Sequence, residues 1–175
     1  MARNIEIKSR IDSIDSIVPA VTALADSGPF EIAQDDTFFA CERGRLKLRM
    51  LSQHEGQLIF YRRGDRKGPK ESSYIITPTT SPGTLRESLS LAYGEVGHVR
   101  KKRTLYLAGR TRVHLDRVEG LGDFLELEVV LEEGESAETG EAIAQGFMQK
   151  LGLSPDQLIE GAYIDLLGGA GASFQ

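Results

Sequence analysis

The sequence predicts an α+β fold built around an antiparallel β-sheet. Two observations predict it: short segments alternate polar with apolar residues and are separated by turn-forming residues, and three other segments carry apolar residues at helical spacing. The 175 residues, 40% of them hydrophobic, are enough for one domain with a sizeable core. We expect that domain to span residues 1–167 and to be followed by a flexible tail of small residues, 168–175.

The strand pattern is clearest at the start of the chain. In residues 4–11, Ile5 and Ile7 lie on one face, and Glu6 and Lys8 lie on the other. The same reading places seven more strands at residues 36–40, 45–51, 57–63, 72–77, 96–108, 111–119 and 124–132.

Three helices are expected between these strands, at residues 14–25, 82–93 and 137–151. Ser and Asp residues at positions 12–16 offer N-caps for the first helix, which Gly28-Pro29 is expected to terminate. Gly94 follows the second helix as a C-terminal stop.

Composition and charge exclude several classes of protein. A net charge of −5 argues against a general nucleic-acid binder, and no apolar stretch approaches the roughly 20 residues that a membrane span requires. The single cysteine, Cys41, cannot form an internal disulfide, and we expect a cytoplasmic protein. The sequence gives no indication of the oligomeric state.

Charged residues are sorted by strand. Lys47 and Arg49 share one face of their strand, whereas Glu126 and Glu128 share one face of another. Such alternation is typical of an open sheet that has one solvated face. However, two glutamates at i and i+2 repel each other unless a cation lies between them. The alternative is a closed barrel with these faces inside, where a ligand combining phosphates and a divalent metal would neutralise both kinds of charge.

Two segments resemble the CYTH, or triphosphate tunnel metalloenzyme, family, which includes class IV adenylyl cyclases and thiamine triphosphatases. Residues 4–8 (Asn-Ile-Glu-Ile-Lys) match the second and third charged positions of that family's Glu-x-Glu-x-Lys signature, with Asn4 in place of the first glutamate. The segment from Val118 to Glu128 is the most specific match and is closest to the class IV cyclases. The resemblance extends from Asn4 to about Leu167.

The resemblance implies a closed eight-stranded antiparallel barrel, a tunnel, with flanking helices. It implies that a triphosphate is bound by Lys8, Lys47, Arg49, Arg62, Lys101, Arg103 and Arg112, although strand parity equally permits Arg63 in place of Arg62. It further implies that Glu6, Glu126 and Glu128 bind Mg²⁺ or Mn²⁺, and that Lys8 and Asp116 act in catalysis.

The implied reaction is conversion of ATP to cyclic AMP and pyrophosphate. The alternatives are hydrolysis of a triphosphate such as thiamine triphosphate, a polyphosphate-binding module without turnover, and a structural sheet protein. The expected partner is a small triphosphate, with neither nucleic acid nor membrane. We expect structural roles for His114 and Tyr163, and a solvated basic loop at Arg66, Lys67 and Lys70.

Overall fold

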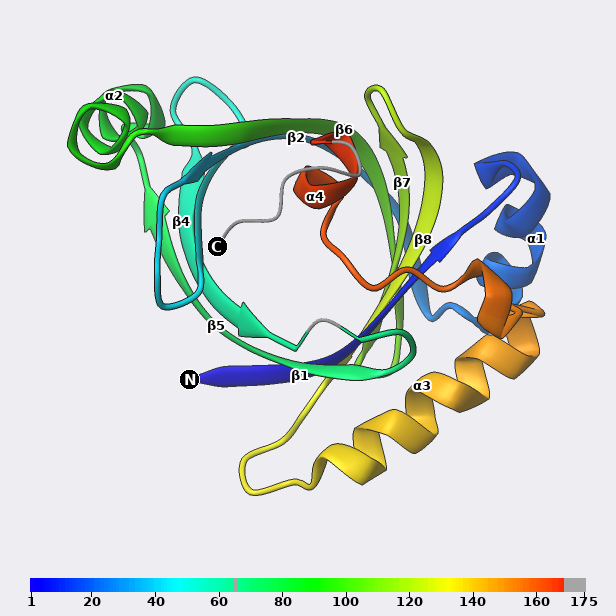
Figure 1. Cartoon of the computed structure of the whole chain (residues 1–175). Helices are drawn as coiled ribbons and strands as arrows, with labels where there is room; N and C mark the ends of the chain where they lie inside the picture. The colour runs from blue at the N-terminus through cyan, green and yellow to red at the C-terminus, as the bar shows by residue number, and fades with distance from the viewer. Residues whose placement is uncertain (65, 169–175) are drawn as a thin grey trace.

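A computed structural model describes residues 1–64 and 66–168 of the chain. Within these residues, eight antiparallel strands close into one ring in the order β1-β5-β4-β3-β2-β6-β7-β8 (Figure 1). The predicted closed antiparallel barrel is therefore confirmed. Of the expected C-terminal tail, residues 169–175 lie outside the described part of the chain.

The strands follow the sequence pattern closely, with one exception. Their bounds are β1 Ala2–Arg10, β2 Ser27–Phe39, β3 Arg45–Met50, β4 Gly56–Arg63, β5 Lys70–Thr79, β6 Glu95–Ala108, β7 Thr111–Val118 and β8 Gly122–Val130. The exception is β2, which begins nine residues before the expected position 36. Its first half pairs with the far end of β6, where Phe30 lies opposite Leu105. A strand held by such a distant partner leaves little trace in its own local pattern.

The helices are α1 Ile14–Leu24, α2 Pro82–Tyr93, α3 Ala137–Leu151 and α4 Tyr163–Leu167, with a short 3₁₀ turn at Pro155–Gln157. Ser13 caps α1 by accepting a hydrogen bond from the Ser16 backbone N–H. The sequence pattern did not indicate α4, because five residues are too short to show helical spacing. Among the described helices, none has the length and apolar character needed to cross a bilayer.

The main hydrophobic core lies outside the ring, between its wall and helices α1 and α3 (Figure 1). Ile5 and Ile7 of β1 and Leu125 and Leu127 of β8 point outward and are fully buried there. Gly140 allows α3 to approach the wall closely, since a Cβ at this position would lie 2.6 Å from atoms of Ile5. Burial of apolar side chains on the outer face leaves the inner face of the same strands available for polar ones.

A smaller apolar cluster lies at one end of the ring, where α4 covers β6. It consists of Phe38, Val99, Val118, Phe124 and Tyr163. Ile164 of α4 occupies the space that a side chain at position 97 of β6 would need, so Gly97 allows α4 to pack against the strand. The C-terminal segment is thereby held over the end of the barrel.

Candidate functional site

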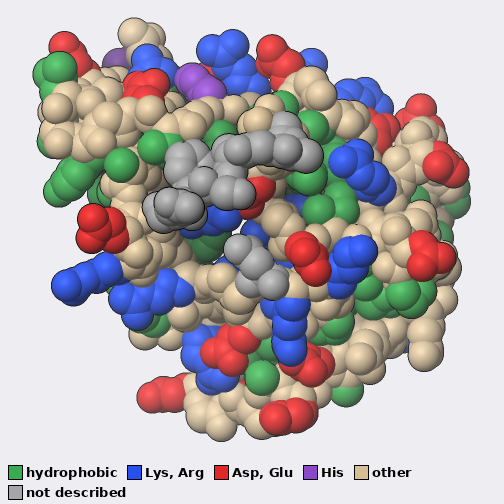
Figure 2. All heavy atoms as spheres, viewed as in Figure 1, with side chains coloured by type: hydrophobic (Ala, Val, Ile, Leu, Met, Phe, Trp, Pro, Cys, Tyr) green, Lys and Arg blue, Asp and Glu red, His purple; other side chains and the backbone are tan. Residues whose placement is uncertain are grey.

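The inward faces of the strands line a cavity of about 320 Å³. Among the described residues, seven Lys and Arg side chains line it and four carboxylates do; with Asp116, which lies behind Arg103, the formal excess is two positive charges when His114 is neutral. The cations are Lys8, Lys47, Arg49, Arg63, Lys101, Arg103 and Arg112, and the carboxylates are Glu6, Asp36, Glu126 and Glu128. Figure 2 shows acidic and basic side chains around a hollow at one end of the ring. Such a cavity favours an anionic ligand.

Most of the residues that the sequence pointed to lie in this cavity. All three glutamates expected to bind metal line it, as do six of the seven cations expected to bind phosphate. The seventh, Arg62, is exposed on the outside of the ring, where its Nε donates to the backbone oxygen of Arg43 at 2.9 Å. Its neighbour Arg63 points inward instead and pairs with Glu6 at 3.2 Å. The expectation for Arg62 is therefore wrong, because its position on β4 faces outward.

One half of the basic wall is organised by Asp36, which sequence reasoning did not single out. Its carboxylate accepts hydrogen bonds from Lys47 Nζ and from Nε and Nη2 of Arg49, each at 2.8 Å. Although burial opposes this effect, the two cations hold the pKa of Asp36 well below its usual range. Burial and the neighbouring Arg49 lower the pKa of Lys47 to about 8.

The other half is organised by Asp116. This carboxylate is fully buried behind Arg103, which donates two hydrogen bonds to it at 2.7 Å, and Tyr163 Oη donates a third at 2.8 Å. Although burial opposes this effect, Arg103 and Lys101 hold the pKa of Asp116 below its usual range. Burial and the charge of Arg103 lower the pKa of Lys101 to about 7. Asp116 thus fixes the direction in which Arg103 enters the cavity.

Lys8 connects the basic wall to the acidic one. Its Nζ lies 3.2 Å from Oε2 of Glu126 and 4.2 Å from the ring centre of Tyr163. The Lys101 ammonium lies 4.9 Å from the same ring. Tyr163 therefore supports two interior cations through its ring and Asp116 through its hydroxyl, more than the packing role expected for it.

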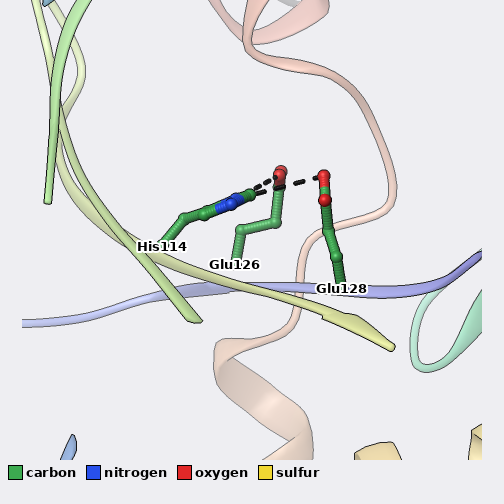
Figure 3. A group of neighbouring side chains, drawn as sticks. All are labelled: His114, Glu126 and Glu128. Atoms are coloured by element: carbon green, nitrogen blue, oxygen red, sulfur yellow. Dashed lines mark hydrogen bonds and ion pairs between the residues drawn. The ribbon is translucent and has the colours of Figure 1, made fainter. Parts of the chain in front are cut away.

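The acidic wall consists of Glu6 on β1 and of Glu126 and Glu128 on β8. His114 on β7 lies beside the two glutamates of β8 (Figure 3). Nδ1 of His114 lies 3.3 Å from Glu126 Oε1 and 4.0 Å from Glu128 Oε1. One ligand atom from each of His114, Glu126 and Glu128 lies within 4.8 Å of the other two. Burial and the charges of Glu126 and Glu128 raise the pKa of Glu6, although Arg63 and Lys8 act against this rise. Glu128 is itself paired with Arg112 at 2.9 Å.

The chemistry of this donor set fits a hard divalent cation. Mg²⁺ and Mn²⁺ prefer carboxylate and carbonyl oxygens, and the carboxylates of Glu126 and Glu128 converge here beside His114, with Glu6 opposite Glu128 on the neighbouring strand. Asn4, two positions before Glu6, adds an amide oxygen that is buried and, among the described residues, has no hydrogen-bond partner. A cation between the carboxylates would offset both the burial of Glu6 and the neighbouring negative charges, which together raise its pKa.

Arg63, on the basic wall, also has buried polar atoms without a hydrogen-bond partner among the described residues. These atoms are its Nε and Nη2. Unpaired buried N–H donors are costly, and a guanidinium fork fits two oxygens of a phosphate. Arg63 is thus poised to bind an anion in the cavity.

Sequence reasoning also misplaced Lys70, which we expected in a solvated loop. It is 1% exposed, and its Nζ donates to the backbone oxygens of Arg66, Ile159 and Glu160. The inward-facing Ser72 lies two residues further along β5, so strand parity could have revealed the direction of Lys70.

Comparison with known proteins places this fold and cavity in a family. The family model for the CYTH domain matches residues 2–163. The chain belongs to the CYTH domain family. The adenylate cyclase CyaB of Aeromonas hydrophila is 28% identical over 167 residues, which cover 91% of this chain and 85% of the relative.

Solved structures share the fold. The PH1012 protein of Pyrococcus horikoshii OT3 superposes with a TM-score of 0.83 at 24% identity, covering 93% of this chain and 98% of its own. The putative adenylyl cyclase HpAC1 of Hippeastrum, described as having a dominant triphosphatase activity, gives a TM-score of 0.64 at 15% identity, covering 93% of this chain and 91% of its own. At these identities the likeness establishes the fold alone.

Proposed function

We propose that this protein is a divalent-metal-dependent enzyme that acts on an organic triphosphate, and that it converts ATP to cyclic AMP and pyrophosphate. The observation that carries the proposal is the excess of cations along one cavity that is also lined by Glu6, Glu126 and Glu128. The 28% identity to the adenylate cyclase CyaB favours cyclisation within the CYTH family.

In this proposal the basic wall binds the phosphate chain. Arg49, Arg63, Arg103 and Arg112 supply planar donor pairs, and Lys47 and Lys101 add ammonium charge. Asp36 and Asp116 do not reach the substrate themselves. They position Arg49 and Arg103, so the phosphates meet donors whose direction is already fixed. We expected Asp116 to act in catalysis, and we now propose that it positions Arg103 instead.

Glu6, Glu126 and Glu128 would hold the metal, with the amide oxygen of Asn4 nearby. Once bound, such a cation supplies positive charge to phosphate oxygens as negative charge develops on them. Lys8, which pairs with Glu126, would contact a phosphate oxygen next to that position. Phosphoryl chemistry depends chiefly on positioning and charge neutralisation, which these residues provide.

The test is a panel of ATP, GTP, thiamine triphosphate and tripolyphosphate, each with Mg²⁺ or Mn²⁺ and with identification of the products. We expect metal-dependent formation of cyclic AMP and pyrophosphate from ATP. Release of inorganic phosphate in its place would identify a triphosphatase, and absence of turnover on the whole panel would contradict the proposal.

A matched pair of variants connects the activity to the site. Glu128→Gln removes a charge from the cavity, and we expect it to abolish turnover. Glu132→Gln makes the same change at a side chain that is 82% exposed, and we expect it to leave turnover unchanged. Equal activity in both variants would refute the assignment of Glu128.

A further inference from the structure

One side of the barrel interior changes character along its axis, whereas Gln57, Arg112 and Glu128 keep other strands polar toward the same end. On three neighbouring strands, β3, β2 and β6, the inward-facing residues pass from charged or polar to aliphatic toward the same end of the ring. These steps are Arg49 to Leu51, Gln34 to Ile32 and Arg103 to Leu105, and all six side chains line the cavity. Ile76 of β5 lines it as well, two residues beyond Tyr74.

This aliphatic rim, defined as Ile32, Leu51, Ile76 and Leu105, is only partly covered by the protein. Ile76 is 44% exposed, and the other three are half-buried. Large aliphatic side chains that face a cavity yet remain accessible are typical of a surface that a ligand covers. The opposite end has its own apolar cluster, but α4 already buries it. The two ends of the ring therefore differ in what they offer a ligand.

We infer that the aliphatic rim is the subsite for the non-phosphate part of the substrate, and that this part has an apolar ring face. The inference rests on the proposed function, because the phosphate chain must lie along the basic wall. Inward positions two residues apart are roughly 6.6 Å apart along a strand. The rim thus lies one such step beyond Arg49 and Arg103, next to the end of a phosphate chain held by them.

Bare tripolyphosphate would gain nothing from this rim, since it is charged along its whole length. An organic triphosphate gains the burial of its ring face against the four aliphatic side chains. Arg112 and Tyr74, joined by a 3.4 Å hydrogen bond, line the cavity as well, and Arg112 Nε also donates to Glu128 Oε2 at 2.9 Å. The rim therefore selects organic triphosphates over inorganic ones. It binds a nucleobase or another apolar ring by the same chemistry.

The test compares ATP, thiamine triphosphate and tripolyphosphate by titration calorimetry in EDTA, where metal-dependent turnover stops. In Ile76→Ser and Leu105→Ser, we expect the Kd of the organic ligand to rise roughly tenfold and that of tripolyphosphate to stay within about twofold. Ile75→Ser is the matched control, because Ile75 is 49% exposed but lies on the outer face of β5. It should change neither Kd.

The outcomes separate this inference from the proposed function. The rim is not the subsite for the non-phosphate part if wild-type protein binds tripolyphosphate at least as tightly as both organic ligands. The same conclusion follows if the rim variants weaken the binding of all ligands equally. In both cases the proposed triphosphate function is unaffected. If wild-type protein binds none of the three in EDTA, the rim assignment fails, and the proposed function fails with it only if the turnover panel with Mg²⁺ or Mn²⁺ is also negative. The organic ligand whose Kd rises in the rim variants, ATP or thiamine triphosphate, identifies the kind of ring that the rim binds.

Discussion

The two faces of β8 use opposite chemistry within one strand. Leu125, Leu127 and Val129 are fully buried against the helices outside the ring, whereas Glu126 and Glu128 alternate with them and line the cavity. In many small proteins the centre of a barrel is its hydrophobic core. Here the core is outside, and the centre holds ion pairs between buried charges.

This difference separates stability from binding. Apolar burial on the outer face favours folding, and buried charges on the inner face cost desolvation free energy that ion pairs repay only in part. A ligand that neutralises the remaining charge stabilises the native state in addition. We therefore expect changes on the two faces to have separable effects.

The largest expected effects come from neighbouring residues on opposite faces of β8. We expect Glu126→Gln to lower kcat/KM for the triphosphate by roughly 10³-fold, equivalent to about 4 kcal/mol. The reason is the loss of one of the converging carboxylates. Because the outer core is untouched, the variant should remain folded by circular dichroism. A kcat/KM near the wild-type value would contradict the role of Glu126 on the inner face of β8.

The partner of that test is Leu127→Ala. Leu127 is fully buried in the outer core, and we expect the free energy of unfolding to fall by about 3 kcal/mol, as measured in urea. At a temperature where the variant is folded, kcat/KM should match the wild-type value. A change in activity as large as that of Glu126→Gln would mean that the two faces are not separable.

A smaller effect is expected from Arg63 and Arg62, which are adjacent on β4 and point to opposite faces. Arg63→Gln removes unpaired donors from the cavity and should raise the Kd of tripolyphosphate at least tenfold. Arg62→Gln changes a side chain outside the ring and should leave the Kd unchanged. Calorimetry measures both, and the opposite ranking would contradict the orientation of β4.

The smallest effect is a dependence on pH. With a pKa of about 7, Lys101 is half protonated at pH 7, and a bound phosphate would raise this pKa. Binding then takes up about half a proton, and affinity falls about threefold per pH unit near pH 7. Calorimetry in buffers of different ionisation enthalpy measures this uptake. Lys101→Arg, which does not titrate, should remove most of it.

The ligand-free protein should respond to pH in the opposite direction. The folded-state pKa values of Lys47 and Lys101, about 8 and about 7, lie below the unfolded value of 10.5, so the unfolded state binds more protons between these limits. These two groups therefore make the native state more stable as pH rises from about 7 to about 9, below the range in which Tyr61 and Tyr163, whose pKa values are raised by burial, act in the opposite direction. Thermal unfolding without ligand should show this rise, and a fall over that range would contradict the buried positions of the two lysines.

Local alternation was enough to predict most of the strands, and residue parity placed Lys47, Arg49, Glu126 and Glu128 on inward faces. Parity alone could not decide between Arg62 and Arg63, because it needs a register that only the paired strands provide. Asp36 was missed for a related reason. Nothing in its own segment indicates that Lys47 and Arg49 lie across from it.

The first and last strands of the ring pair with each other, with Glu6 opposite Glu128 and Lys8 opposite Glu126. The acidic wall is thus shared between segments from the two ends of the domain, and it forms only when the ring closes. Closing so long a stretch of chain is slow, because its entropy is lost before the contacts form. If Glu6 holds a metal ion together with Glu126 and Glu128, as proposed, that ion would bind only after closure and would slow the separation of β1 from β8.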